Sequence, residues 1–244
     1  MQGGLSFAEQ HRLTVLAARQ QGQDCPPAAE LPLARTMRHK LSADRARLKQ
    51  IASMQAKSAI KAELVQAYMP YLDGVMAAGG GDEVLTQVMV WAFDAGQMNT
   101  MWQLASHALD HGLNLPGEFS RPLHAWLAES VAKWTIAALE SGQEVTMAAI
   151  MVEQRTASMD MHDQIRAKLH HACGLLLEAI NNPELALEHY RSALLFDSHC
   201  RVKTRIKFLE KAFQSPQEPA ADSKATAMGT ALPAAVLAVP LAAA

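Results

Sequence analysis

Residues 167–200 read AKLHHACGLLLEAINNPELALEHYRSALLFDSHC and predict two helices joined by a turn. Pro183 follows Asn181-Asn182 in this turn, where its fixed φ and missing backbone donor interrupt a helix. Two packed helices need small residues where they touch and larger ones that fill the groove between them. The positions that meet this need are Gly174, Leu177, Ala186, Tyr190 and Ala193. The stretch therefore predicts a helical hairpin.

This spacing is typical of a tetratricopeptide unit, although the Trp and the terminal Pro of that signature are missing. One such unit cannot bury its own face, so we expect it to stack on the preceding helices and on a following helix, Cys200–Phe213. The predicted fold is all-α, with stacked helical hairpins that include one tetratricopeptide-like unit. In this interpretation Tyr190 lines a groove that binds a partner peptide.

The composition of the whole chain indicates the same fold class. Of its 244 residues, 50% are hydrophobic but only 5% are aromatic. Ala, Leu and Met favour helices, whereas the β-branched and aromatic residues that favour strands are scarce, which argues against a sandwich or barrel. Cys25, Cys173 and Cys200 have no metal-like spacing and suit a reducing compartment. Residues 1–10 lack the pattern of a signal peptide, so we expect an intracellular protein.

The first 67 residues divide into two predicted segments. Residues 1–34 combine a short N-terminal helix, 7–19, with a Pro-rich linker. Residues 35–67 contain neither Gly nor Pro and predict one long helix. Its apolar residues recur at steps of three, four or seven, apart from one longer gap between Ile51 and Ile60; they are Met37, Leu41, Leu48, Ile51, Ile60 and Leu64. Such a helix is expected to pack against copies of itself, which predicts a homo-oligomer.

Charge is distributed unevenly along the chain, whose formal net charge is −2. Residues 1–61 have a net charge of +6, and residues 62–200 have a net charge of −11. A basic segment can neutralise phosphates, while so acidic a body would be repelled by nucleic acid. The long helix is therefore the candidate DNA-binding element. Its predicted phosphate contacts are Arg35, Arg38, Lys40, Arg45, Arg47 and Lys49.

The rest of the chain is predicted to form an acidic helical-hairpin domain, residues 68–213, and a tail, residues 214–244. Pro70 and Gly74 are expected to interrupt the chain where this domain begins. A hairpin is predicted around the turn Asp94-Ala95-Gly96. The tail is rich in Ala and contains several Pro, so we predict disorder rather than a membrane span.

Few groups of residues in the sequence could perform chemistry. No glycine loop followed by Lys-Ser/Thr is present, so the phosphate cradle of an ATPase is missing. His107 and His111 lie one helical turn apart, and we interpret them as part of a polar helix face rather than as metal ligands. Cys173 lies in an apolar register and is predicted to be a packed thiol, not a nucleophile.

One compact acidic cluster precedes a predicted helix. Asp160, His162 and Asp163 are the weak catalytic candidates of this chain. They could hold Mg²⁺ for phosphodiester cleavage, and Mg²⁺ is expected as a cofactor only if nuclease activity is intrinsic. The same residues suit an N-cap and an acidic first turn, which is the interpretation we prefer. No metal site is predicted.

Several short segments, in order along the chain, resemble the small terminase subunit of temperate tailed bacteriophages, of the type described as the terminase endonuclease subunit. The segments are 68–75 (YMPYLDGV), 88–91 (VMVW), 94–96 (DAG), 108–117 (ALDHGLNLPG) and 160–175. The resemblance extends over roughly residues 6–212.

This resemblance implies a role in packaging viral DNA. The small subunit of such a machine recognises double-stranded viral DNA, and a large subunit supplies the ATPase, which agrees with the missing phosphate cradle. The family also implies a homo-oligomeric ring, the host cytoplasm as the site of action, and an endonuclease role in maturing DNA ends, although no nuclease motif is visible. The alternative is a non-enzymatic scaffold that binds the large subunit or the procapsid without recognising DNA directly.

Overall fold

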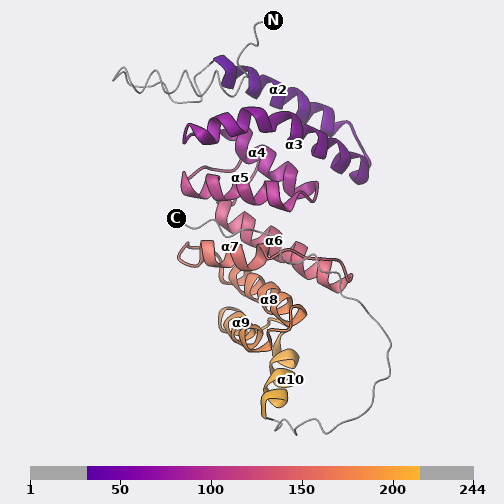
Figure 1. Ribbon diagram of the computed structural model, residues 1–244, viewed down its shortest axis with the longest axis vertical. Coiled ribbons are helices and arrows are strands. Elements are labelled where there is room, and N and C mark those ends of the chain that lie inside the picture. Colours follow the sequence, from indigo (N-terminus) through magenta and orange to yellow (C-terminus); the bar gives the residue numbers. More distant parts are fainter. Residues whose placement is uncertain (1–31, 215–244) are drawn as a thin grey trace, which may run out of the picture. The chain divides into compact units, whose positions relative to one another are not determined.

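The computed structural model describes residues 32–214, which fold into helices joined by short turns and loops (Figure 1). No strand is present among these residues, so the predicted all-α class is confirmed. The helix predicted at 7–19 and the tail beyond residue 214 lie outside the described residues. The helices are α2 (Pro32–Lys49), α3 (Met54–Ala77), α4 (Glu83–Asp94), α5 (Met98–Asp110), α6 (Leu123–Glu140), α7 (Ala148–Thr156), α8 (Asp163–Ala179), α9 (Pro183–Phe196) and α10 (Lys203–Gln214).

The single long helix predicted for residues 35–67 is wrong, because two helices, α2 and α3, cover this stretch. The chain leaves helical conformation at Ile51, and Ser53 caps α3 by accepting a hydrogen bond from the backbone nitrogen of Ala56 at 3.3 Å. Pro70 lies inside α3 rather than at an interruption, so the boundary expected between residues 67 and 68 falls within a helix. Burial of one face of α3 outweighs the local preference of Pro70.

The chain divides into two compact units. Unit 1 includes residues 32–130 and 158–161, and unit 2 includes residues 131–157 and 162–214. Helix α4 is the centre of unit 1, since every residue from 84 to 92 is buried. It forms the predicted hairpin with α5 around Gly96, which adopts a φ of 72° that favours glycine. The Asp82 side chain caps α4 by accepting from the backbone nitrogen of Val84 at 3.0 Å.

Helix α2 is attached to unit 1 by apolar contacts and by a hydrogen bond. Leu41 and Leu48 are buried, as is Leu64 on α3. The Tyr68 hydroxyl on α3 donates to Asp44 Oδ2 on α2 at 2.9 Å. Three of the residues predicted to form a seam between copies are therefore buried within the chain itself. The homo-oligomer stays a prediction, but this pattern does not support it.

Unit 2 is organised around a core from α8, α9 and α10. The buried residues of this core are Leu177, Ala186, Leu187, Tyr190, Ala193, Val202, Ile206 and Leu209. The predicted stacking of a following helix is thus confirmed by α10. Tyr190 is 0% exposed and its hydroxyl donates to the Glu178 carboxylate, so its predicted role in an open peptide groove is wrong. The likeness to a tetratricopeptide unit stays a prediction.

At Gly174, the backbone of α8 lies directly against the Tyr190 ring of α9. A Cβ atom built on Gly174 would lie 2.4 Å from Tyr190 Cε1, a distance that real Cβ contacts do not show. The large ring therefore fills the space that the glycine leaves open. The sequence pattern predicted this contact, because it places a small residue opposite a large one.

A pair of histidines links the same two helices. His170 on α8 and His189 on α9 bring their Nδ1 atoms within 3.0 Å, and the Phe196 ring stacks on His170. The pKa of His170 is lowered to about 4, chiefly by burial and also by the positive charges of His189 and Arg166. Because one ring must accept the hydrogen bond, the pair forms only while at least one imidazole is neutral.

None of the helices within residues 32–214 combines the length and the apolar character that crossing a membrane requires.

Replacing Gly174 with Ala should lower the free energy of unfolding by up to about 2 kcal/mol. The overlap with Tyr190 costs about 1 to 3 kcal/mol, and the better helix propensity of Ala returns only about 1 kcal/mol. Urea unfolding followed by circular dichroism measures the change. Gly117→Ala is the matched control, because its Cβ would meet nothing within 4 Å. A stabilised Gly174→Ala variant would show that the Tyr190 ring moves aside.

Unit 2 should lose stability as the pH falls from 6.5 towards 4. The folded-state pKa of His170 is lowered, so the unfolded chain binds its proton more readily in this window. At pH 5 the expected loss is about 2 kcal/mol relative to pH 7.5. Urea unfolding at both pH values tests this, and His170→Gln should reduce the difference; part should remain, because burial also lowers the pKa of His171 and His189.

Candidate nucleic-acid interface

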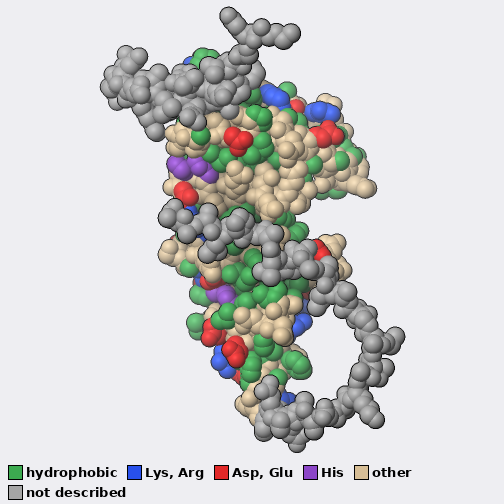
Figure 2. Space-filling model, viewed as in Figure 1, with side chains coloured by type: hydrophobic (Ala, Val, Ile, Leu, Met, Phe, Trp, Pro, Cys, Tyr) green, Lys and Arg blue, Asp and Glu red, His purple; other side chains and the backbone are tan. Residues whose placement is uncertain are grey.

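All six cations predicted to contact DNA lie on α2, but they differ in exposure. Figure 2 shows Lys and Arg side chains along the edge of unit 1 that α2 forms. Arg38 and Arg45 are half-buried. The exposed members are Arg35, Lys40, Arg47 and Lys49. Since Ala34, Leu41 and Leu48 face the interior, the exposed cations are held on the outward half of the helix.

Four of the cations form a stripe along α2. Arg35, Arg38, Arg45 and Lys49 follow one another at steps of three, seven and four residues, and Ser42 fills the position between them. Residues at such steps lie on one side of a helix. The stripe extends over about 21 Å of helix axis, because each residue adds about 1.5 Å. Lys40 and Arg47 lie seven residues apart on the other flank.

Lys40 is engaged by its own unit. Its Nζ donates to Asp44 Oδ2 at 2.8 Å and lies 3.8 Å from the centre of the Tyr68 ring. Asp44 also accepts the Tyr68 hydroxyl, so the three side chains form one network. Lys40 must give up these contacts to reach a phosphate, which makes it a poorer DNA contact than the sequence predicted.

Arg38 lies beside a second tyrosine–carboxylate pair. The Tyr71 hydroxyl donates to Asp82 Oδ2 at 2.9 Å. Burial and the Asp82 carboxylate raise the pKa of Tyr71, and the positive charge of Arg38 opposes that rise. The Arg38 guanidinium therefore balances the charge of Asp82, the partly buried N-cap of α4.

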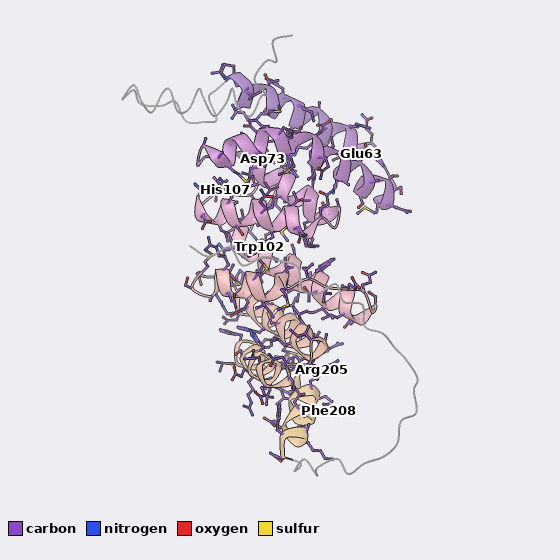
Figure 3. The ribbon with its side chains drawn as sticks, viewed as in Figure 1. Glu63, Asp73, Trp102, His107, Arg205 and Phe208 are labelled. Carbon is purple, nitrogen blue, oxygen red and sulfur yellow. The ribbon has the colours of Figure 1, made fainter. Side chains whose placement is uncertain are left out.

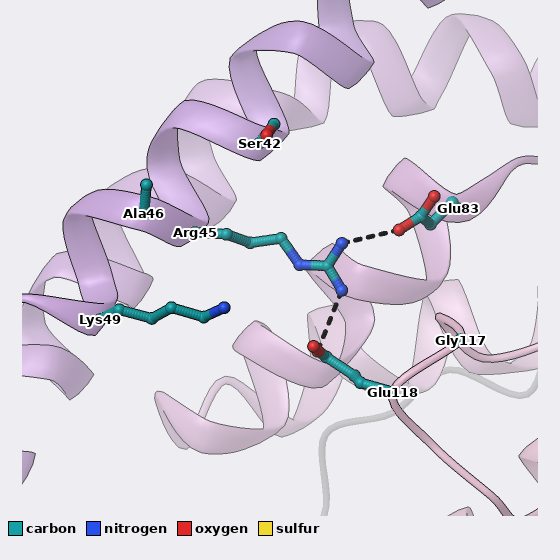
Figure 4. A pocket seen from close by; sticks show the side chains of 7 residues that line it. All are labelled: Ser42, Arg45, Ala46, Lys49, Glu83, Gly117 and Glu118. Atoms are coloured by element: carbon teal, nitrogen blue, oxygen red, sulfur yellow. Dashed lines mark hydrogen bonds and ion pairs between the residues drawn. The ribbon is translucent and has the colours of Figure 1, made fainter.

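Arg45 is held by two carboxylates from distant parts of unit 1 (Figure 4). Its Nη1 donates to Glu83 Oε1 at 2.7 Å, and its Nη2 lies 3.0 Å from Glu118 Oε1. Burial would lower the pKa of Arg45, but the hydrogen bonds to Glu118 and Glu83 raise it. No sequence motif marks these partners, because they are brought to α2 only by the fold.

A pocket of ≈ 480 Å³ opens beside this arginine. Helix α2 lines one wall with Ser42, Arg45, Ala46 and Lys49. Glu83, Gly117 and Glu118 line the other. The pocket thus combines two cations with two carboxylates, and it suits an anion only where a carboxylate moves away.

Three cations of α2 remain available to an external anion. Arg35, Arg47 and Lys49 are exposed, and none forms an ion pair with another residue between 32 and 214. An exposed, unpaired cation can bind a phosphate without first breaking a contact within the protein. These three residues are therefore the best supported DNA contacts of the six.

The weak catalytic candidates do not form a helix cap as expected. His162 occupies the N-cap position of α8, but its side chain makes no capping hydrogen bond. Asp163 lies in the first turn, as an acidic residue at a helix N-terminus should. Asp160 belongs to unit 1, whereas the other two belong to unit 2, and its backbone carbonyl accepts from His124 Nε2 at 2.7 Å.

The other chemical candidates are occupied by structural contacts. His107 lies on α5 (Figure 3). Its Nε2 donates to the Gly80 carbonyl at 2.6 Å, and its ring stacks on that of His111 with ring centres 4.0 Å apart. Cys173 is buried, which raises the pKa of its thiol, so the predicted packed thiol is confirmed. Within residues 32–214, no group of three or more His, Cys, Asp or Glu side chains is placed to hold a metal ion.

Comparisons with known proteins agree with the resemblance seen in the sequence. The family model described as the phage small terminase subunit matches residues 38–164, which include most of α2 and the rest of unit 1. The protein named "Terminase, endonuclease subunit" of Escherichia phage P2 is 34% identical over 217 residues, which is 88% of each chain. No solved structure matches. The chain therefore belongs to the phage small terminase subunit family.

Proposed function

We propose that this chain binds double-stranded viral DNA through the outward half of α2 and, together with a large ATPase subunit, starts genome packaging. Membership of the small terminase family supports a role in packaging. The observation that carries the DNA contact is the set of exposed cations Arg35, Arg47 and Lys49, which form no ion pair among the described residues. These cations are free to neutralise phosphates.

The chemistry of α2 suits the backbone of a duplex better than single-stranded bases. Its 18 residues contain no Phe, Tyr or Trp, so it offers no aromatic surface for bases to stack on. Arg and Lys at several positions can instead neutralise phosphates without demanding one geometry. The helix is about 27 Å long at about 1.5 Å per residue, so it can contact several phosphates at once.

The charge of the remaining chain favours an approach through α2. Residues 62–200 have a net charge of −11, which repels a polyanion. Outside residues 62–200, the basic stretches of the described chain are α2 and the shorter stretch 201–211, in which five Lys/Arg face one Glu. Long-range attraction to α2 and repulsion elsewhere would orient the protein before contact.

The triple variant Arg35→Gln, Arg47→Gln, Lys49→Gln should bind duplex DNA at least about tenfold more weakly at low salt. Its plot of log affinity against log salt should also lose about two to three units of slope, because three phosphate contacts disappear. Fluorescence anisotropy with a packaging-site duplex and an unrelated duplex of equal length measures both quantities. Circular dichroism should show an unchanged fold, since the three side chains are exposed.

A charge-matched variant in unit 2 provides the control. Arg201, Lys203 and Lys207 are exposed, and changing all three to Gln removes the same charge without touching α2. Equal losses in the two variants would contradict a specific role for α2. If the wild-type chain binds neither duplex at low salt, DNA recognition is not its function. The scaffold alternative, in which the chain binds only the large subunit or the procapsid, would then replace this proposal.

A further inference from the structure

The pocket beside Arg45 holds the elements of a phosphate-binding site. Ser42, Arg45 and Lys49 occupy successive positions of one stripe on α2, at steps of three and four residues. Figure 4 shows the Lys49 amine and the Arg45 guanidinium directed towards the same space. A hydroxyl, a guanidinium and an ammonium are all donors to phosphate oxygens. In the free protein, however, the guanidinium already has two carboxylate partners.

The two carboxylates are held differently. Glu83 is the first residue of α4, where the positive end of the helix dipole stabilises its charge. Glu118 belongs to the loop between α5 and α6, and its side chain is 51% exposed, against 44% for Glu83. Its ion pair with Arg45 is also the longer of the two, at 3.0 Å against 2.7 Å. Glu118 is therefore the partner that an external anion can replace.

The loop around Glu118 can keep its place when the side chain leaves. The next residue, Phe119, packs edge-on against Trp126 with ring centres 6.0 Å apart. Trp126 in turn packs against Phe93 of α4 at 5.7 Å. These ring contacts anchor the backbone beside Glu118, so only side-chain rotation is needed to open the site.

We propose that this pocket is the seat of one backbone phosphate of duplex DNA, and that Glu118 occupies the seat in the free protein. The inference rests on the proposed DNA-binding function. When DNA binds, Arg45 keeps its hydrogen bond to Glu83, and its Nη2 donates to a phosphate oxygen instead of to Glu118. Lys49 donates to the same phosphate. The displaced carboxylate turns to solvent. Both anions present oxygen acceptors to the same planar donor, so they compete directly.

This competition makes Glu118 a regulator of affinity. The Glu118 side chain is 51% exposed, so solvent screens its ion pair with Arg45, and a duplex that brings several phosphates to α2 together can displace it. A single free phosphate lacks the neighbouring contacts and has no such advantage. The seat therefore favours a continuous phosphate backbone, although Glu118 lowers the affinity for a duplex as well as for a single phosphate.

Glu118→Gln should tighten duplex binding by about three- to fivefold, because the amide competes poorly for the guanidinium. Glu118→Asp keeps the charge but shortens the side chain, so it should give part of the same gain. Glu63→Gln is the matched control, because this exposed glutamate lies on α3 (Figure 3), whereas the carboxylates paired with Arg45 are Glu83 and Glu118. Fluorescence anisotropy at fixed salt gives the dissociation constants, and thermal unfolding verifies the fold of each variant.

A double-mutant cycle separates direct competition from a general charge effect. In an Arg45→Gln background, Glu118→Gln should change DNA affinity by no more than Glu63→Gln does, because the residue it competes for is gone. An equal gain in affinity in both backgrounds would contradict the proposed phosphate site. So would unchanged affinity of Glu118→Gln when the wild type binds DNA, and the proposed function would then survive alone. If the wild-type chain does not bind DNA, both proposals fail.

Discussion

The burial of one face of α2 against α3 and α4 is the constraint on which the rest of the interface depends. Leu41 and Leu48 set the side of the helix that faces inward, and the hydrogen bond from Tyr68 to Asp44 fixes its position on α3. Rotating α2 would expose two leucines and leave a buried hydroxyl without an acceptor. The direction of every cation on the helix follows from this attachment.

The attachment sorts six similar cations into different roles. Lys40 completes the network with Asp44 and Tyr68, and Arg38 lies beside the Tyr71–Asp82 pair. Arg45 ties α2 to α4 and to the loop that carries Glu118. The formal charge of a segment is thus a poor measure of what a polyanion meets, because half of these cations already have anionic or aromatic partners in unit 1.

Sequence patterns predicted the elements whose signals are local. The hairpin at Asp94-Ala95-Gly96 and the close approach of Gly174 to Tyr190 follow from turn chemistry and helical spacing. The break between α2 and α3 was missed because residues 50–52 contain no Gly or Pro, and only Ser53 marks it. Pro70 predicts an interruption that the structure does not have, because the packing of α3 accommodates a proline inside the helix. Tyr190 was placed in a groove because spacing alone does not show what covers a ring.

The candidate site was predictable only in part, for a similar reason. A cluster of cations on one helix is visible in sequence, whereas Glu83 and Glu118 approach Arg45 only after the chain has folded. The family match begins at Arg38 and covers α2 beyond that residue together with both carboxylates. It stops at residue 164, before the paired histidines and the Tyr190 core. Unit 1 therefore contains the helix, the acidic partners and the pocket on which the proposed DNA contact rests, while the described contacts of unit 2 account for its own packing and its expected pH dependence.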